Sequence, residues 1–333
     1  MTKKVYKLKK WPKIVLVVLI ILGVLLHFGM KKYREYQYTQ SYEYKLLEIG
    51  YSNDQTKILE EHLKPEELDK ILTYQYNEFI SEFVTRKYFI FNNLDKYLSQ
   101  VITKEEDFFK YHGTEGYDYD AIVASVNVGT VDEFYTNSKK TNRDEGYSMM
   151  VNKYHELGSD FEPDDLVDIP WKYRLGLEKE TVKIRKVAYD AYMEMWEAAN
   201  SEEGIYLLAL SGYRSYSDQA RVYKQYEDFK GTKYADSIAA RPGYSEHQTG
   251  LSLDIYSKEC QTQSGFKDSK TYAWLIKNAH KYGFILRYPE GQQKLTGYNY
   301  ESWHYRYVGV ELATKVYEEG ITYDEYYAYY LEK

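Results

Sequence analysis

Cysteine and excess positive charge are both scarce in this sequence, and each scarcity excludes a class of protein. Cys260 is the single cysteine among 333 residues, so no disulfide can form within the chain and its stability must come from packing. One cysteine leaves the cellular compartment undecided. The formal net charge of -7 argues against a nucleic-acid partner, because such binding normally requires a basic face.

The composition is otherwise that of a folded protein. Hydrophobic residues make up 44% of the chain and charged residues 29%, which are ordinary values for a globular protein and exclude a disordered one. A length of 333 residues allows one medium domain and a smaller accessory one. The 41 tyrosines are unusual, and we interpret them as a compositional habit rather than as a functional signal.

One long hydrophobic run lies near the N-terminus. Residues 14–30 form a run of 17, interrupted only by Gly23, His27 and Gly29. At ~1.5 Å per residue such a helix spans roughly 25 Å, just enough for the core of a bilayer. The basic residues before it are Lys3, Lys4, Lys7, Lys9, Lys10 and Lys13, and those after it are Lys31, Lys32 and Arg34.

This charge asymmetry predicts the topology. The excess of lysine before the run predicts a cytoplasmic basic tail over residues 1–13, a transmembrane anchor over 14–30 and an extracytoplasmic location for everything that follows. The alternative is a cleaved signal peptide. Residues 28–32 offer no small-residue cleavage site, so the sequence favours an uncleaved anchor.

Residues 31–136 are predicted to form an extracytoplasmic stalk and a small, mainly helical accessory module. Leucine and isoleucine recur at three- and four-residue steps from about residue 45 to 110, and the segments beginning at Ser52 and Pro65 are typical helix starts. Residues 121–129 are β-branched and partly alternating, which predicts a strand. Residues 137–147 are polar and are predicted to be a linker.

Residues 148–333 are predicted to form one α+β domain. We expect helices at 180–200, 217–229, 270–281, 309–319 and 323–331, and strands at 205–210, 250–256, 282–288 and 302–308. Ser217 is the expected N-cap of the helix at 217–229. No cluster with evident chemistry occurs before this domain, whereas three segments inside it contain candidate functional residues.

The first of these segments is Ser245-Glu246-His247-Gln248-Thr249-Gly250-Leu251-Ser252-Leu253-Asp254-Ile255. Its alternation after the glycine places Leu251, Leu253 and Ile255 on one face of a strand and Asp254 on the other. His247 precedes the glycine turn, so His247 and Asp254 are two candidate zinc ligands. Taken alone, the segment is better explained by an exposed strand aspartate and a turn histidine.

The second segment is Glu301-Ser302-Trp303-His304-Tyr305-Arg306-Tyr307. Glu301 and His304 suit a general base and a metal ligand. On a flat strand, residues three apart point to opposite faces, so this function requires an irregular local geometry. The alternative is an aromatic core strand with a hydrogen-bonded histidine, and the segment alone favours that alternative.

The third segment is Ser211-Gly212-Tyr213-Arg214-Ser215, with Gln219 in the helix that follows. An arginine at the end of a strand and beside a helix N-terminus is well placed to bind a carboxylate through paired hydrogen bonds. An ordinary surface arginine is the usual alternative.

Together the three segments indicate more than each does alone. Two histidines and one carboxylate leave a fourth zinc position open, which is typical of a catalytic rather than a structural site. A second carboxylate could take a proton from water, and an arginine that binds a terminal carboxylate would restrict the enzyme to chain ends.

In this order, the motifs SGYRS-x3-Q, SEHQTGLSLD and ESWHYRYVG resemble those of the D-alanyl-D-alanine carboxypeptidase family of bacterial zinc peptidases, which includes the VanY and LdcB types. The resemblance covers roughly residues 148–333 and implies a small antiparallel sheet flanked by helices. Two positions depart from the family pattern: Ser252 stands where alanine is common, and Ser302 where proline is common.

The resemblance also implies roles for individual residues. The implied zinc ligands are His247, Asp254 and His304, the implied catalytic base is Glu301, and the implied substrate-binding residues are Arg214, Gln219 and Ser245. The expected reaction is removal of the C-terminal D-alanine from peptidoglycan stem peptides at the cell surface, by a domain anchored in the membrane.

Two alternatives remain open at this stage. One is an L,D-carboxypeptidase that acts on tetrapeptide stems. The other is a catalytically silent protein that binds the cell wall, although such a binder would not need the general base.

Overall fold

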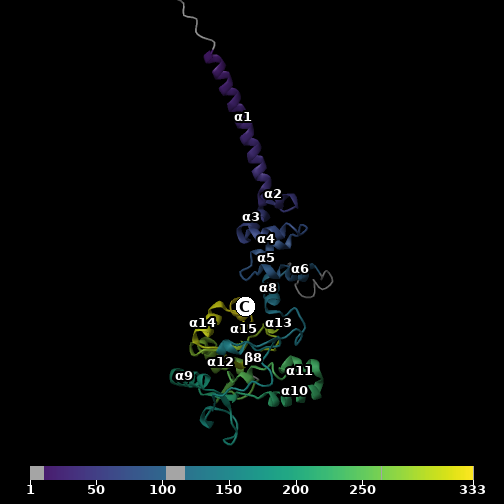
Figure 1. Ribbon diagram of the computed structural model, residues 1–333. Coiled ribbons are helices and arrows are strands. Elements are labelled where there is room, and N and C mark those ends of the chain that lie inside the picture. Colours follow the sequence, from purple (N-terminus) through teal and green to yellow (C-terminus); the bar gives the residue numbers. More distant parts are fainter. Residues whose placement is uncertain (1–10, 103–116, 264, 333) are drawn as a thin grey trace, which may run out of the picture. The chain divides into compact units, whose positions relative to one another are not determined.

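The computed structural model describes residues 11–102, 117–263 and 265–332 (Figure 1). Residues 1–10 of the predicted basic tail lie outside the described residues. The chain divides into two compact units, residues 1–119 and 120–333. The domain boundaries expected at residues 136 and 148 stay a prediction.

In the described part of the first unit, the regular elements are helices joined by short turns. Its elements are α1 (Trp11–Gln40), α2 (Tyr42–Glu48), α3 (Asn53–His62), α4 (Pro65–Ile71), α5 (Phe79–Val84), η1 (Phe91–Asn93) and α6 (Leu94–Ile102). From Ile14 to Gln40, α1 is long and apolar enough to cross a membrane, and none of its hydrophobic stretch is buried within the structure. Two predicted helix starts are confirmed: Ser52 and Gln55 form a capping box before α3, and Pro65 occupies the first turn of α4.

The second unit begins with short elements that precede its first long helix. They are α8 (Tyr119–Val128), β1 (Lys139–Lys140), η2 (Arg143–Ser148), β2 (His155–Glu156), β3 (Leu166–Asp168), η3 (Trp171–Tyr173) and β4 (Lys183–Arg185). Within the predicted linker at 137–147 the structure has β1 and most of η2, and Thr141 is buried. As a boundary between domains, the linker stays a prediction.

The remaining elements build the sheet and its cover. They are α9 (Lys186–Glu203), β5 (Leu207–Ser211), α10 (Tyr216–Lys230), α11 (Thr232–Ile238), η4 (Glu246–Thr249), β6 (Ser252–Ser257), η5 (Phe266–Asp268), α12 (Lys270–Asn278), η6 (Ala279–Tyr282), β7 (Phe284–Tyr288), α13 (Gln293–Thr296), β8 (Glu301–Tyr307), α14 (Val310–Glu319), α15 (Tyr323–Tyr326) and η7 (Tyr327–Leu331). This confirms the expected α+β class with a small antiparallel sheet.

The central sheet has the order β5-β6-β8-β7, and all its neighbouring strands are antiparallel. One face of the sheet supplies the main hydrophobic core, in which Leu253, Ile255 and Tyr305 pack with residues of α9 and α12. The predicted alternation in β6 is confirmed, because Leu253 and Ile255 lie in that core while Ser252 and Asp254 do not. The opposite face is therefore free to hold polar groups.

Three expectations about secondary structure were wrong. The strand expected at 121–129 is helix α8, because Ile122, Val123 and Val126 are buried at helical spacing. The helix expected from residue 180 starts at 186, since β4 pairs with β3 first. The N-cap of α10 is Ser215 rather than Ser217: the Ser215 hydroxyl accepts a hydrogen bond from the backbone of Asp218.

Gly283, between η6 and β7, is required by a close approach. Its φ is +81°, and a Cβ atom there would lie 2.7 Å from Tyr307 and 3.0 Å from the carbonyl carbon of Gly309. Gly204, at the end of α9, also has a positive φ, of +65°, but a Cβ there would meet nothing within 4 Å. Substitutions at these two glycines therefore separate the energetic cost of backbone strain from that of steric overlap.

We expect Gly283→Ala to destabilise the second unit by about 2–5 kcal/mol, because left-handed strain of ~1–2 kcal/mol adds to overpacking of ~1–3 kcal/mol. Gly204→Ala should cost only the strain. Urea unfolding followed by tryptophan fluorescence measures both, since Trp196 and Trp274 lie in the core of this unit. Equal effects of the two substitutions would show that the contact with Tyr307 and Gly309 is unimportant.

Candidate metal and peptidase site

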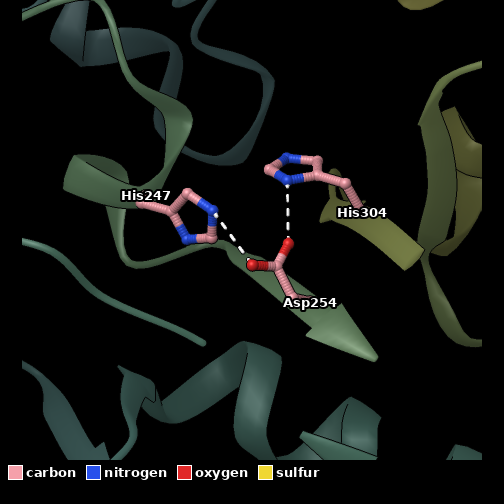
Figure 2. Close-up of side chains that lie close together, drawn as sticks. All are labelled: His247, Asp254 and His304. Atoms are coloured by element: carbon pink, nitrogen blue, oxygen red, sulfur yellow. Dashed lines mark hydrogen bonds and ion pairs between the residues drawn. The ribbon is translucent and has the colours of Figure 1, made fainter. Parts of the chain in front are cut away.

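Asp254 and His304 face each other across two neighbouring strands. They are direct partners in the antiparallel register of β6 and β8, which brings residues 50 positions apart into contact. The Asp254 Oδ1 atom lies 3.2 Å from His304 Nδ1. His247, from the short helix η4, approaches from the other side, and its Nε2 lies 3.7 Å from Asp254 Oδ2. Figure 2 shows the carboxylate of Asp254 between the two imidazole rings.

These three side chains could hold a metal ion. One ligand atom from each of the three lies within 4.8 Å of the others, and all three residues are at least partly buried. The ring planes of His247 and His304 are almost perpendicular, with centroids 5.0 Å apart. Two imidazole nitrogens and one carboxylate oxygen, with room for a further ligand, match the donor set of a catalytic zinc site.

Hydrogen bonds on the far side of each imidazole orient the rings. His247 Nδ1 lies 2.7 Å from the carbonyl oxygen of Gly212, to which it can donate, and this leaves Nε2 as the nitrogen that faces Asp254. His304 Nε2 lies 3.4 Å from a carboxylate oxygen of Glu246, which leaves Nδ1 facing Asp254. Partners of this kind commonly fix the tautomer of metal-binding histidines.

Glu301 lies beside this group because β8 is irregular. Tyr305 pairs with Leu286 of β7, but Glu301 pairs with Tyr288, so four residues of β8 correspond to two of β7. This bulge confirms the expected irregular geometry and brings Glu301 Oε2 to 3.7 Å from His304 Nδ1. The side chain of Glu301 retains 20% exposure, so it borders the open side of the site.

The electrostatics of the site follow from burial and from the excess of carboxylates. Burial raises the pKa of Glu301 to about 7. Burial, together with the positive charge of Arg214, lowers the pKa of His247 to about 3. Burial would also lower the pKa of His304, but hydrogen bonds to Asp254 and Glu246 outweigh it and raise the pKa to about 9. The carboxylates of Asp254 and Glu246 thus favour a positive charge on His304.

Arg214 lies at the same pocket. It follows β5, where a bulge between Ala209 and Ser211 ends the regular pairing with β6. The guanidinium donates to Gln219 Oε1 at 2.8 Å and to Ser211 Oγ at 3.1 Å. Gln219 in turn donates to the carbonyl oxygen of Ala240 at 2.7 Å. Gln219 thus fixes the arginine.

All seven residues predicted from the sequence converge on one pocket of about 160 Å³. Its walls include His247, Asp254, Glu301 and His304, together with Arg214, Gln219 and Ser245. The predicted roles of these residues stay predictions. A pocket of this size, lined by three candidate metal ligands and a guanidinium, can accept a small anionic group such as a peptide terminus.

Sequence reasoning missed the other residues that line this pocket, and they include three aromatic residues and one glutamate beside the candidate ligands. The rings of Tyr288, Tyr298 and Trp303 line it, and the ring of Tyr288 lies 4.9 Å from that of His304. The glutamate is Glu246, which precedes His247 in the chain and is only 2% exposed. Its position beside a candidate ligand was the one available signal, because nothing local indicates that a glutamate will be buried.

Comparison with known proteins shows the family to which the chain is related. Residues 181–310 match the family model VanY, D-alanyl-D-alanine carboxypeptidase. YodJ of Bacillus subtilis (strain 168) is 40% identical over 187 residues, which are 55% of this chain and 67% of YodJ. VanXYC of Enterococcus gallinarum, a bifunctional D-Ala-D-Ala dipeptidase and D-Ala-D-Ala carboxypeptidase, is 33% identical over 186 residues, 54% of this chain and 93% of that protein.

A solved structure also resembles this chain. The structure of the LdcB LD-carboxypeptidase, described as revealing the basis of peptidoglycan recognition, aligns with a TM-score of 0.55 and 38% sequence identity. The alignment covers 58% of this chain and 91% of that one. The match shows that the sheet and its surrounding helices are a shared fold.

Proposed function

The chain belongs to the D-alanyl-D-alanine carboxypeptidase family, and on that premise we propose that it is a zinc-dependent carboxypeptidase that removes the C-terminal D-alanine from peptidoglycan stem peptides. The observation that carries the proposal is the convergence of His247, Asp254 and His304 with Glu301 and Arg214 in one pocket. A binding protein would need the arginine but not a buried carboxylate beside three ligands.

The metal in this proposal is Zn²⁺, held by His247 Nε2, a carboxylate oxygen of Asp254 and His304 Nδ1. When bound, zinc would supply Lewis acidity for the scissile carbonyl and would lower the pKa of water towards ~7. The donor set fits this ion, since both imidazoles are oriented by hydrogen bonds and Asp254 supplies a negative charge.

Glu301 is the proposed proton carrier. With a pKa raised to about 7 by burial, its carboxylate can accept a proton from the attacking water near neutral pH. The same proton is then donated to the amine nitrogen of the departing D-alanine as the C–N bond breaks. One side chain at the open side of the site thereby serves both halves of the hydrolysis.

Arg214 is the proposed partner of the substrate carboxylate. Its guanidinium is already oriented by Gln219 and Ser211, so little conformational freedom remains to be lost when the peptide binds. Ser245 lines the same pocket, and its hydroxyl group is proposed to lie near that carboxylate. Recognition of a terminal carboxylate would explain trimming of chain ends rather than cleavage within a chain.

The site leaves two substrates to be distinguished. The likeness to VanXYC favours a terminal D-Ala-D-Ala, whereas the likeness to LdcB favours an L,D-carboxypeptidase that acts on tetrapeptide stems. Our first choice is the D,D-reaction. The third possibility, a silent wall-binding protein, is disfavoured because all four predicted metal and base residues are present and face one another.

We expect the purified full chain to release D-alanine from pentapeptide muropeptides and to stop when a chelator removes the metal. Products are weighed by mass spectrometry, with tetrapeptide muropeptides as the parallel substrate. Loss of alanine from the tetrapeptide alone would establish the L,D-reaction instead. If neither substrate loses alanine although zinc is bound, the silent binder replaces both enzyme proposals.

We expect Glu301→Gln to abolish turnover while zinc remains bound, because Glu301 is proposed to move the proton rather than hold the metal. Removal of a general base typically costs about 10²–10⁴-fold in rate. Zinc content is measured by atomic emission on the same sample. The matched control is Glu290→Gln, which should keep full activity, because the exposed side chain of Glu290 forms only a surface ion pair with Lys267. Full activity of Glu301→Gln would refute the assignment of the base.

The helix α1 is proposed to anchor the protein in the membrane, with the second unit on the outer side, where the cell wall lies. Its support is the apolar run over residues 14–30 within α1 and the excess of lysine before it. We therefore expect the intact mass of the protein extracted from membranes to include residues 1–30. A shorter product that lacks this segment would show that it is a cleaved signal sequence.

A further inference from the structure

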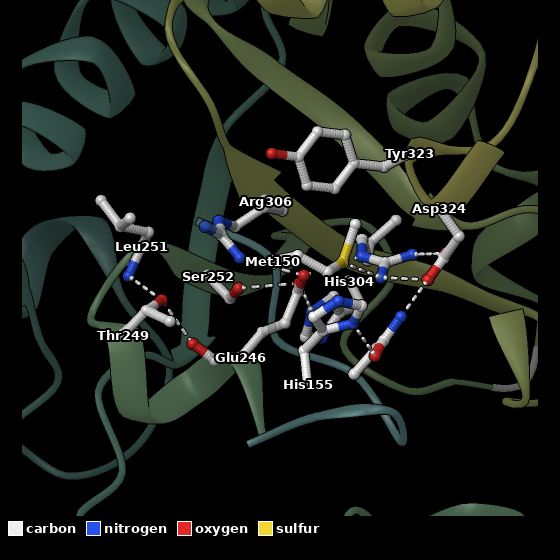
Figure 3. Close-up of polar contacts among 12 residues, drawn as sticks. Met150, His155, Glu246, Thr249, Leu251, Ser252, His304, Arg306, Tyr323 and Asp324 are labelled. Atoms are coloured by element: carbon white, nitrogen blue, oxygen red, sulfur yellow. Dashed lines mark hydrogen bonds and ion pairs between the residues drawn. The ribbon is translucent and has the colours of Figure 1, made fainter. Parts of the chain in front are cut away.

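A buried cluster of charges lies directly behind His304. The carboxylate of Glu246 accepts hydrogen bonds through one oxygen from Arg287 Nε at 2.7 Å and from Arg306 Nη1 at 3.0 Å. Its other oxygen lies 3.4 Å from His304 Nε2 and accepts from Ser252 Oγ at 3.3 Å. Figure 3 shows Glu246 between Arg306 and His304. Both oxygens of this carboxylate thus have polar partners.

The two arginines are themselves fixed. Arg306 also donates to the carbonyl oxygens of Tyr147 at 3.0 Å and Met149 at 2.9 Å. Both Nη atoms of Arg287 contact the carboxylate of Asp324 in α15. The distance from Arg287 Nη2 to Asp324 Oδ1 is 3.0 Å. Both arginine side chains and the Glu246 side chain have 0% exposure. The cluster contains two positive and two negative side chains, so its formal charges cancel.

The position of Glu246 determines which nitrogen of His304 is free. A carboxylate can only accept a hydrogen bond, so Nε2 must carry the proton in this contact. In the neutral imidazole, which metal binding requires, Nδ1 is then the nitrogen with the free lone pair, and it faces Asp254 where the other two candidate ligand atoms converge. His247 is fixed in the complementary way by the carbonyl oxygen of Gly212.

We propose that Glu246 is a positioning residue for the metal site, which holds His304 in the tautomer and orientation that bind the ion through Nδ1. Arg287 and Arg306 in turn hold Glu246, and Asp324 extends the cluster to α15, so a C-terminal helix supports a metal ligand. The inference rests on the proposed zinc site. It concerns the affinity for metal and adds no group that touches the substrate.

The test is the zinc affinity of Glu246→Gln in the full chain, extracted in detergent, measured by competition with a chromogenic chelator. The amide keeps the shape of the side chain, but its N–H group can face His304 Nε2 and thus favours the tautomer that protonates Nδ1. We expect the affinity to fall by about 10–100-fold relative to the unaltered chain. The absorption spectrum of bound Co²⁺ should change as well, because one ligand is displaced or rotated.

The matched control is Glu325→Gln. Glu325 is also buried, at 9% exposure, and it caps the N-terminus of α15 through Thr322. Its loss should lower the thermal stability but leave the zinc affinity and the Co²⁺ spectrum unchanged. Equal zinc affinities for Glu246→Gln and the unaltered chain would overturn the proposal.

A second variant covers the case in which Glu246→Gln does not fold. The double substitution Glu246→Gln with Arg306→Gln removes one charge of each sign, so the cluster stays neutral while His304 still lacks its carboxylate partner. We expect the same loss of zinc affinity in this variant, and unaltered affinity would contradict the role of Glu246. Failure of the unaltered chain to bind zinc would instead refute the zinc site itself, so the two failures are distinguishable.

Discussion

The buried ion cluster around Glu246 is the constraint on which the functional half of this structure depends. Burial alone would raise the pKa of Glu246, but the charges of Arg287 and Arg306 outweigh it and hold the pKa below its usual range. Removing one partner from such a cluster typically costs ~3–5 kcal/mol, because it leaves a charge without compensation. The cluster consists of these three side chains and Asp324, and its members must stay together. They connect η4, β7, β8 and α15.

The central sheet places the candidate site residues on its polar face. One face of β6 and β8 packs into the apolar core, so the opposite face can place Asp254 and His304 opposite each other. Two bulges then break the regular pairing where function needs it. The bulge in β8 directs Glu301 towards His304, and the bulge at the end of β5 leads the chain to Arg214. In a regular strand, Glu301 and His304 would point to opposite faces.

Expectations about secondary structure were correct where packing and local pattern agree, and wrong where they conflict. The strands of the central sheet and the starts of α3 and α4 agree with their local signals. Residues 121–129 carry a strand-like composition, yet they form a helix because their apolar residues are buried at three- and four-residue spacing. The start of α9 was placed too early because the pairing of β4 with β3 is a contact between distant segments.

The sequence by itself determined the presence of an apolar N-terminal segment, the α+β class and the set of residues that could perform the chemistry. It did so because hydrophobic runs, turn residues and short motifs are local patterns. Only the tertiary structure decided how those residues meet. The contact of Glu246 with Arg306 joins positions 60 apart, and the fit of Tyr288 against His304 depends on a register that no local pattern specifies. The burial of a charged residue is set by its partners, and those partners are assembled only when the chain folds.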